Sequence, residues 1–197
     1  LIESLEEVSK QAHEIFRAFP LPVVVKPLAG GSSVGVTIAK DFSSFEKAVR
    51  DAFEHSNSVM VEEFIKGKEA TCGVIDNYRE QEFYALPPIE IRPHNGNFFD
   101  YSAKYEGKSD EIVPGNFTES EKREIENMAI QAHKALGLSH YSRSDFIIHP
   151  KRGIFILESN TLPGLTEESL LPKALKAVGA SVSHFLDHVI ELAITRK

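Results

Sequence analysis

Apolar residues recur along the chain with two different spacings, which predict where helices and strands lie. Near-helical spacing begins at Ile2 and predicts a first helix that ends near Phe19. The same spacing predicts further helices over residues 43–53, 118–136, 170–178 and 185–193. Runs rich in β-branched residues predict strands at 22–27, 34–39, 58–65, 69–75 and 82–91, then a hairpin at 143–160. Because these elements mix without a regular βαβ rhythm, we predict an α+β fold.

Two capping-box patterns, Ser43–Glu46 and Thr118–Glu121, indicate where two of the helices begin, and Gly137 indicates where the second ends. We expect their apolar stripes to be buried: Phe45, Ala48, Val49, Ala52 and Phe53 on the first, and Ile125, Met128, Ala129, Ala132 and Leu136 on the second. Pro87–Pro88 indicates that strand 82–91 is an edge strand, and the polar stretch 94–116 predicts a long loop.

The predicted hairpin carries charged residues where strands usually alternate apolar and polar positions. If Lys151–Arg152 is a two-residue loop, Asp145 lies opposite Glu158 and Arg143 lies opposite Asn160. All four side chains then project from one face. Two carboxylates about 5 Å apart repel by roughly 3 kcal/mol at an effective dielectric constant of 20. A divalent cation would offset this repulsion, and carboxylate and amide oxygens suit magnesium or manganese.

Two other interpretations of the hairpin remain open. A three-residue loop would shift the register by one residue and place Asp145 and Glu158 on opposite faces. The polar residues could also be solvated strand ends, with Arg143 neutralising Asp145.

Two segments in the first third of the chain could bind a nucleotide. Lys26 ends a strand and precedes the glycine-rich segment Gly30–Gly35, whose backbone N–H groups and hydroxyls could surround a phosphate. The segment is neither a Walker A loop nor a dinucleotide fingerprint, and a simple hairpin turn explains its glycines equally well. Residues 62–65 could present backbone groups to a planar base, with Glu69 reaching a sugar hydroxyl, although solvated strand-end carboxylates explain the same pattern.

Composition excludes several classes of partner. The chain has 197 residues, 42% of them apolar, and a net charge of -7, which argues against nucleic acid or an anionic membrane surface as partner. No apolar run approaches the length of a membrane span. The single cysteine, Cys72, lies in an apolar run, which predicts a packed side chain and a reducing cytosol. We expect His184 and His188 to face solvent, and the spacing of the histidines suggests no Ser-His-Asp arrangement.

Taken in order, these motifs resemble the ATP-grasp part of D-alanine–D-alanine ligases, from about Leu21 to the C-terminus. The resemblance rests on Lys26, Gly30–Gly35, 62–69, 100–105, 143–145 and 158–166. It implies two α+β lobes with ATP between them, which we place at residues 1–69 and 70–197. The family's N-terminal domain has no counterpart before Leu1, and helical spacing starts at once. We therefore expect this sequence to be a fragment of a longer polypeptide.

The resemblance also implies roles for individual residues. Lys26 and Lys104 of the mobile ω loop would hold the phosphates, and Ser32 and Ser33 would close over them. The adenine and ribose would be bound by Glu62, Glu63, Phe64, Ile65 and Glu69. Two Mg²⁺ or Mn²⁺ ions would be bound by Asp145, Glu158 and Asn160.

The implied reaction joins two D-alanines through an acyl phosphate, in the synthesis of a peptidoglycan precursor. Arg143 and the backbone N–H of Gly164 would form an oxyanion hole, and Ser169 with Leu170 would hold the carboxylate of the second D-alanine. Tyr105 would latch the ω loop. The alternatives are a ligase that uses D-lactate, which Lys104–Tyr105 disfavours, and a nucleotide-binding module without ligase activity. The family further implies a cytoplasmic protein that could be a homodimer.

Overall fold

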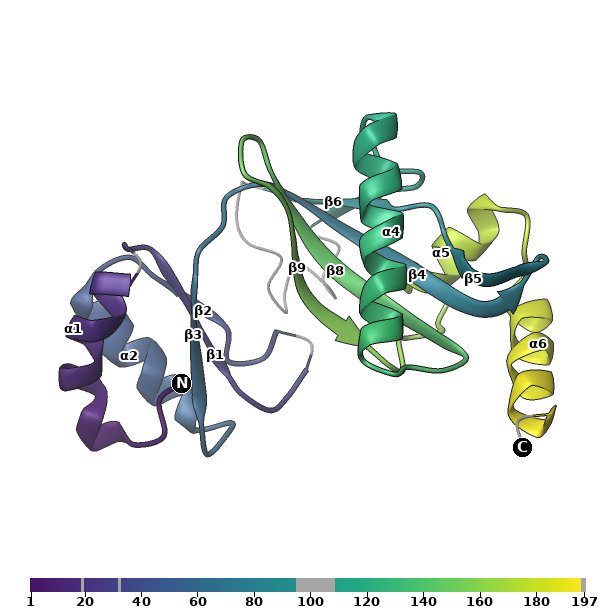
Figure 1. The fold of residues 1–197 in the computed structure, drawn as a ribbon. Coiled ribbons are helices and arrows are strands. Elements are labelled where there is room, and N and C mark those ends of the chain that lie inside the picture. Colours follow the sequence, from purple (N-terminus) through teal and green to yellow (C-terminus); the bar gives the residue numbers. More distant parts are fainter. Residues whose placement is uncertain (19, 32, 95–108, 196–197) are drawn as a thin grey trace. The chain divides into compact units, whose positions relative to one another are not determined.

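The computed structural model describes residues 1–18, 20–31, 33–94 and 109–195, and these form two compact units (Figure 1). Of the described residues, 1–65 form the first unit, and 66–92 and 110–195 form the second, while Pro93, His94 and Ser109 are grouped with the first. Our expectations for Ser32, Lys104 and Tyr105 concern residues outside the described part of the chain.

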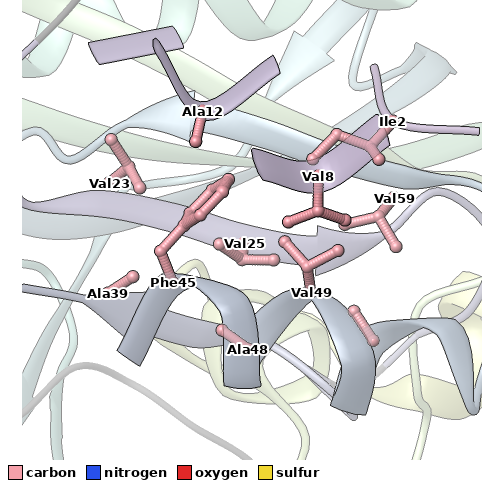
Figure 2. Packing of buried hydrophobic residues seen from close by; sticks show 11 residues of the cluster. Ile2, Val8, Ala12, Val23, Val25, Ala39, Phe45, Ala48, Val49 and Val59 are labelled. Carbon is pink, nitrogen blue, oxygen red and sulfur yellow. The ribbon is translucent and has the colours of Figure 1, made fainter. Parts of the chain in front are cut away.

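The first unit is a three-stranded antiparallel sheet, in the order β2-β1-β3, covered by two helices. Its elements are η1 (Leu5–Glu7), α1 (Val8–Ala18), β1 (Val23–Pro27), β2 (Thr37–Ala39), α2 (Phe42–Phe53) and β3 (Val59–Glu63). Figure 2 shows its core, in which Phe45 and Val49 of α2 pack on Val23 and Val25 of β1. The predicted buried stripe of α2 is confirmed, with Phe53 only partly buried.

Helix α2 begins two residues earlier than the Ser43–Glu46 pattern predicted. Asp41 is the N-cap, because its carboxylate accepts a hydrogen bond from the Ser44 N–H at 2.7 Å while the Ser44 hydroxyl accepts one from the Asp41 N–H at 3.0 Å. The Ser44 N–H holds the pKa of Asp41 below its usual value. An aspartate three residues before a serine forms the same reciprocal cap as the predicted pair.

The second unit is a six-stranded sheet, in the order β7-β6-β4-β8-β9, with β5 also paired to β4. Its strands are β4 (Lys68–Tyr78), β5 (Gln81–Ala85), β6 (Ile89–Pro93), β7 (Ser109–Ile112), β8 (Tyr141–His149) and β9 (Gly153–Asn160). Its helices are α4 (Glu119–Ala135), α5 (Leu170–Ala177) and α6 (Val182–Thr195). Helix α4 runs across β4 and β8 (Figure 1) and buries Ile125 and Ala129 against Cys72 and Phe146. The predicted burial of Cys72 is confirmed, and burial raises the pKa of its thiol.

Three local predictions in this unit are wrong. The strand expected over residues 82–91 is interrupted at Pro87–Pro88, so it forms β5 and β6, and the loop expected at 94–116 contains β7. On α4 the capping box of Thr118 and Glu121 is confirmed, but Leu136 is 62% exposed. His133 is buried in its place, because its ring has polar partners inside the fold.

Among the described helices, none alone is long and apolar enough to cross a membrane, although α5 and α6, bent by 103°, pass that test together on length and composition.

Candidate functional site

The turn between β8 and β9 contains three residues, so the predicted two-residue loop is wrong. His149 pairs with Gly153, which has a φ of 86° that glycine adopts without strain. The His149 ring Nδ1 accepts the backbone N–H groups of Lys151 and Arg152, each at 3.0 Å. This register, continued along the hairpin, would have separated Asp145 from Glu158.

A β-bulge at Leu157 restores the predicted register. Phe146 pairs with Ile156, but the next residue on β8, Asp145, pairs with Glu158, so Leu157 is the extra residue. From there Arg143 pairs with Asn160, as expected. The predicted pairing is therefore confirmed, although the turn that we assumed is not the one that produces it.

Strand β4 extends this arrangement across a third strand. Two rows cross β4, β8 and β9 on one face: Thr71–Asp145–Glu158 and Gly73–Arg143–Asn160. Glu69 precedes Thr71 by two residues, so it lies on the same face, opposite Ile147. The structure thus brings Glu69 to the same sheet face as the three expected metal ligands and Arg143.

Arg143 and Thr71 bind the Asp145 carboxylate directly. Arg143 Nε donates to Oδ1 and Nη2 donates to Oδ2, both at 3.0 Å, and the side chains of the pair are 16% and 18% exposed. The Thr71 hydroxyl donates to Oδ1 at 2.6 Å. The interpretation in which Arg143 neutralises Asp145 is therefore correct, and it coexists with the cross-strand pair of carboxylates.

The donor set fits a divalent cation that prefers oxygen ligands. Within the described residues the side chains of Glu158 and Asn160 make no hydrogen bond or ion pair, so their oxygens are available. Asp145 retains accepting capacity at Oδ2, which accepts a single hydrogen bond from the described residues. No cluster of three or more His, Cys, Asp or Glu residues suited to a metal occurs in the described ranges. The expected ligands are two carboxylates, Asp145 and Glu158, and one amide, Asn160, so they do not form a cluster of that kind.

Helix α5 begins beside this face. Gly73 lies so close to α5 that a Cβ would come within 2.7 Å of Leu171 Cδ1 and 3.0 Å of Leu86 Cδ1. A narrow hollow is lined by Thr71, Gly73 and Arg143 from the sheet and by Leu170, Leu171 and Ala174 from α5. The absence of a side chain at Gly73 thus lets the start of α5 approach Arg143.

Gly164 and Ser169 also lie together at the start of α5. Ser169 is the N-cap of the helix, but its hydroxyl does not cap the helix and instead bonds the Thr166 hydroxyl at 2.8 Å. A Cβ on Gly164 would lie 2.8 Å from that same Ser169 oxygen. The predicted residues Gly164, Ser169 and Leu170 are therefore neighbours at one helix N-terminus.

Lys173 anchors α5 to β7. Its ammonium binds Glu111 at 2.8 Å and Glu168 at 2.9 Å. Burial alone would lower the pKa of Lys173, but the hydrogen bonds to the two carboxylates outweigh it, so the pKa lies above its usual value. Lys173 therefore stays charged and its anchoring contacts persist at neutral pH.

In the first unit, Lys26 and Glu62 are brought together. Lys26 Nζ lies 2.7 Å from a Glu62 carboxylate oxygen, with the two side chains 18% and 38% exposed. Glu63 ends β3 opposite Val23, and the Phe64 N–H donates to the Pro22 carbonyl at 3.4 Å. Strand β3 lies at one side of the three-stranded sheet, so residues 60–63 have no further strand beside them among the described elements.

The glycine-rich segment turns sharply after β1. Ser33 adopts a φ of 58° and Gly35 a φ of 73°, and Val34 N–H donates to Gly31 O at 3.1 Å. Left-handed residues beside right-handed ones turn successive N–H groups toward one side, which suits an anion. A Cβ on Gly35 would lie 2.7 Å from the His55 ring.

Sequence reasoning missed two sets of side chains around β8. Thr71 escaped notice because its partner Asp145 is 74 residues away. The second set is a buried Ser-His-Asp array on the opposite face: the Ser142 hydroxyl lies 2.7 Å from His133 Nδ1, and His133 Nε2 lies 2.9 Å from Asp76 Oδ1. Both Ser142 and His133 are 0% exposed, so the array cannot reach a substrate.

The expectation that two C-terminal histidines face solvent is half right. His184 is exposed, but His188 is partly buried and lies 2.7 Å from the Asp76 carbonyl oxygen. Its ring also packs edge-on against Tyr78. The contact with Asp76 thus joins α6 to β4.

Comparison with known proteins gives a consistent picture. Residues 2–191 match a family described as D-ala D-ala ligase C-terminus. A D-alanine–D-alanine ligase from Desulfotalea psychrophila is 40% identical over 188 residues, which cover 94% of this chain and 58% of that protein. The VanG D-Ala:D-Ser ligase from Enterococcus faecalis superposes with a TM-score of 0.80 at 35% identity, covering 93% of this chain and 53% of that one.

A further solved structure, the D-alanine–D-alanine ligase from Bacillus anthracis complexed with ATP, superposes with a TM-score of 0.74 at 34% identity, covering 93% of this chain and 56% of that one. The chain thus spans little more than half the length of these relatives. Their likeness confirms the predicted α+β fold of the ATP-grasp type.

Proposed function

The chain belongs to the D-alanine–D-alanine ligase family, and we propose that it forms the nucleotide-binding and metal-binding part of an ATP-dependent ligase that joins two D-alanines. ATP would phosphorylate the carboxylate of one D-alanine and leave as ADP, and the amine of the second D-alanine would attack the acyl phosphate, displace inorganic phosphate and lose a proton to form the peptide bond. The product is a precursor of peptidoglycan. The observation that carries this proposal is the sheet face on which Asp145, Glu158 and Asn160 lie beside Arg143.

Two divalent cations, Mg²⁺ or Mn²⁺, are the proposed cofactors, with Asp145, Glu158 and Asn160 as ligands. When bound, they neutralise charge on the transferring phosphoryl group. The chain's own contribution is to hold its ligands in place. Arg143 and Thr71 fix the Asp145 carboxylate, and Glu158 across the strand has both oxygens available.

Arg143 can serve Asp145 and the reacting carbonyl together. A guanidinium has five N–H donors, and only those on Nε and Nη2 are directed at Asp145. The remaining donors, with the backbone N–H of Gly164, would stabilise the oxyanion of the tetrahedral intermediate. Such donors accelerate the reaction because they are already oriented when the negative charge develops.

The start of α5 would bind the carboxylate of the second D-alanine. The first N–H groups of a helix have no intrahelical acceptor and favour an anion. The Ser169 hydroxyl does not cap these groups, so they remain available to a substrate. The adjoining residue Leu170 provides the first N–H inside the helix.

In the first unit Lys26 and Ser33 would bind the phosphates. The backbone groups of Glu63 to Ile65 would bind the adenine. Glu62, which is paired with Lys26, would bind the adenine amino group. On the second unit, Glu69 would bind the ribose. Roles for Ser32, Lys104 and Tyr105 stay predictions from the resemblance.

The identity of the second substrate is also a proposal. The VanG relative is named as a D-Ala:D-Ser ligase and is 35% identical to this chain, so D-serine is a second candidate acceptor. The gene product that contains this chain, incubated with ATP, D-alanine and either D-serine or D-lactate, would separate the possibilities by its products. Light scattering on the same gene product would test for the proposed homodimer. Fractionation of its source cells would test for a cytoplasmic location.

Calorimetry with Mn²⁺ and a non-hydrolysable ATP analogue tests the proposed binding role on the chain itself. We expect nucleotide binding that depends on the cation. We also expect the gene product to release phosphate from ATP faster when D-alanine is added. ATP binding without any such stimulation would instead favour a nucleotide-binding module without ligase activity.

A further inference from the structure

Thr71 occupies an unusual place beside the proposed metal ligands. It lies on β4 directly opposite Asp145, and its side chain is 1% exposed. Its hydroxyl lies 2.6 Å from Asp145 Oδ1 and 3.1 Å from the Ser144 carbonyl oxygen. A hydroxyl has a single proton, and the shorter distance is that of a charge-assisted bond. The proton is therefore directed mainly at the carboxylate.

The hydrogen bonds of Asp145 leave only one oxygen with spare capacity. Among the described residues, Oδ1 accepts from Thr71 and from Arg143 Nε, whereas Oδ2 accepts only from Arg143 Nη2. A carboxylate oxygen has two lone pairs, so Oδ1 is fully used and Oδ2 keeps one lone pair free. The orientation of the carboxylate thus decides whether that lone pair is presented to a cation.

Arg143 alone would not fix this orientation. It is two residues from Asp145 on the same strand and has a long side chain, so the two could turn together as a pair. Thr71 is held by different means. It is β-branched and buried, and its strand is flanked by β6 on one side and β8 on the other. Its hydroxyl is therefore a fixed reference point outside the strand that carries Asp145.

We propose that Thr71 is a positioning residue, whose hydroxyl holds the Asp145 carboxylate in the orientation that presents Oδ2 to a divalent cation. The inference rests on the proposed function, because it assumes that Asp145 is a metal ligand. The role proposed for Thr71 is indirect, because its hydroxyl acts on the cation only through Asp145. Partners of this kind typically change metal affinity by about 10- to 100-fold when they are removed.

Three variants separate the hydroxyl from the rest of the side chain. Thr71→Val keeps the branched shape and removes the donor, whereas Thr71→Ser keeps the donor and removes the methyl group. Ser142→Ala is the matched control, because it removes a buried hydroxyl from β8 on the opposite face of the sheet, where it bonds His133. Circular dichroism establishes that each variant is folded before binding is measured.

The primary measurement is the affinity for Mn²⁺ in the presence of a non-hydrolysable ATP analogue, followed by electron paramagnetic resonance. We expect Thr71→Val to bind Mn²⁺ about tenfold more weakly than the wild type. Thr71→Ser should remain within about threefold of the wild type, and Ser142→Ala should be unchanged, because neither loses the donor to Asp145. Wild-type affinity in Thr71→Val, or equal losses in Thr71→Ser and Thr71→Val, would overturn the inference and leave the proposed function standing.

A crystal structure of Thr71→Val without metal tests the inference independently of cation binding. We expect the Asp145 carboxylate to turn away from its wild-type orientation in Thr71→Val and to keep that orientation in Thr71→Ser. An unmoved carboxylate in Thr71→Val would refute the positioning role. Failure of the wild-type chain to bind Mn²⁺ with nucleotide would count against the proposed function instead, and the crystal structures would still decide the role of Thr71.

Discussion

Each unit holds its candidate site residues in an acid–base pair, and the two pairs differ in rigidity. In the first unit Lys26 meets Glu62 through one contact of 2.7 Å, and Glu62 is 38% exposed. In the second, Arg143 binds both oxygens of Asp145, and Thr71 adds a third bond of 2.6 Å. A single-contact pair with one exposed partner contributes at most about 1 kcal/mol, whereas a partly buried carboxylate that accepts three hydrogen bonds is held more firmly.

The difference corresponds to what each pair is proposed to bind. A phosphate chain is flexible, and it can displace a weakly held glutamate from a lysine at little cost. A magnesium ion needs its oxygen ligands close to octahedral positions at about 2.1 Å, so its ligands have to be positioned in advance. The comparison therefore predicts that loss of a metal ligand in the second unit abolishes cation binding, and that substitutions in the Lys26–Glu62 pair change nucleotide affinity only modestly.

The largest effect is expected from Glu158→Gln. It removes the negative charge that faces Asp145 across the strands. The affinity for Mn²⁺ in the presence of nucleotide should therefore fall by more than about 100-fold, which exceeds the loss typical of a residue that only positions a metal ligand. Calorimetry measures this loss. Asn160→Ala should behave similarly, and both variants should keep the wild-type melting temperature within about 2 °C, because neither side chain makes a hydrogen bond or an ion pair within the described residues. Normal affinity in either variant would contradict the ligand assignment.

Gly73→Ala tests whether close packing of α5 keeps the second unit rigid. The new methyl group would meet Leu171 Cδ1 at 2.7 Å, so we expect a loss of about 2 kcal/mol in the free energy of unfolding. Urea denaturation measures it. Gly137→Ala is the comparison variant for Gly73→Ala. A Cβ at Gly137 meets nothing within 4 Å, so the only cost there is the strain of an alanine at a φ of 62°. Equal stability of Gly73→Ala and the wild type would show that α5 is packed loosely.

Lys26→Met tests the more exposed pair. It removes one charge-assisted hydrogen bond to phosphate, which corresponds to about a tenfold weaker affinity for the nucleotide. Because the lysine is proposed to act on phosphate rather than on the cation, the affinity for Mn²⁺ at saturating nucleotide should stay unchanged in Lys26→Met. A weaker affinity for Mn²⁺ would place Lys26 among the residues that organise the metal.

Thr118→Ala tests a part of the second unit away from the site. The Thr118 hydroxyl accepts the Glu121 N–H at 3.2 Å, so we expect a loss of about 1 kcal/mol in stability, measured by thermal unfolding, with nucleotide affinity unchanged. The Thr118 N–H, with a smaller contribution from its hydroxyl, holds the pKa of Glu121 below its usual value.

The pH dependence of this cap has a definite sign. Because the pKa of Glu121 is lowered by folding, its contribution is complete above the unfolded value near 4.5 and is lost as pH falls through the folded pKa. Glu121→Ala should therefore lose stability at pH 7 but lose progressively less below about pH 4. If the difference in stability between Glu121→Ala and the wild type stays constant from pH 7 to below about pH 4, the ionised Glu121 carboxylate in the cap is not the cause of that difference.

The smallest effect is expected from Glu62→Gln. It breaks an exposed pair, so the free energy of unfolding should change by less than about 1 kcal/mol. The triphosphate affinity should rise slightly, since Lys26 no longer has a competing carboxylate. A loss of stability as large as that of Gly73→Ala would erase the contrast between the two pairs.

Much of the fold follows from local patterns. The capping box at Thr118 and the buried stripe from Phe45 to Ala52 are predicted from spacing alone, because both arise within one helix. Helix α2 nevertheless begins after Asp41, since aspartate caps a helix as well as serine does. His133 was not predicted in the core, because its polar neighbours, Ser142 on β8 and Asp76 on β4, meet its ring only through the tertiary fold.

The part of the site that depends on the alternation of side chains along a strand was predictable from sequence. The part that depends on the conformation of the turn and the bulge was not. Asp145 and Glu158 were placed opposite each other on the assumption of a two-residue turn, whereas the chain uses a longer turn and a bulge at Leu157. No glycine marks that bulge, so its position could not be deduced from sequence. Thr71 joins the site through strand pairing, which a single sequence does not reveal.

The most direct test of the central claim is a crystal structure of the chain with Mn²⁺ and a non-hydrolysable ATP analogue, examined for anomalous scattering. The account predicts manganese peaks within coordination distance of Asp145 Oδ2, Glu158 and Asn160, with Thr71 and Arg143 still bonded to Asp145. Manganese bound to the nucleotide alone, with those three side chains turned away from it, would contradict the account.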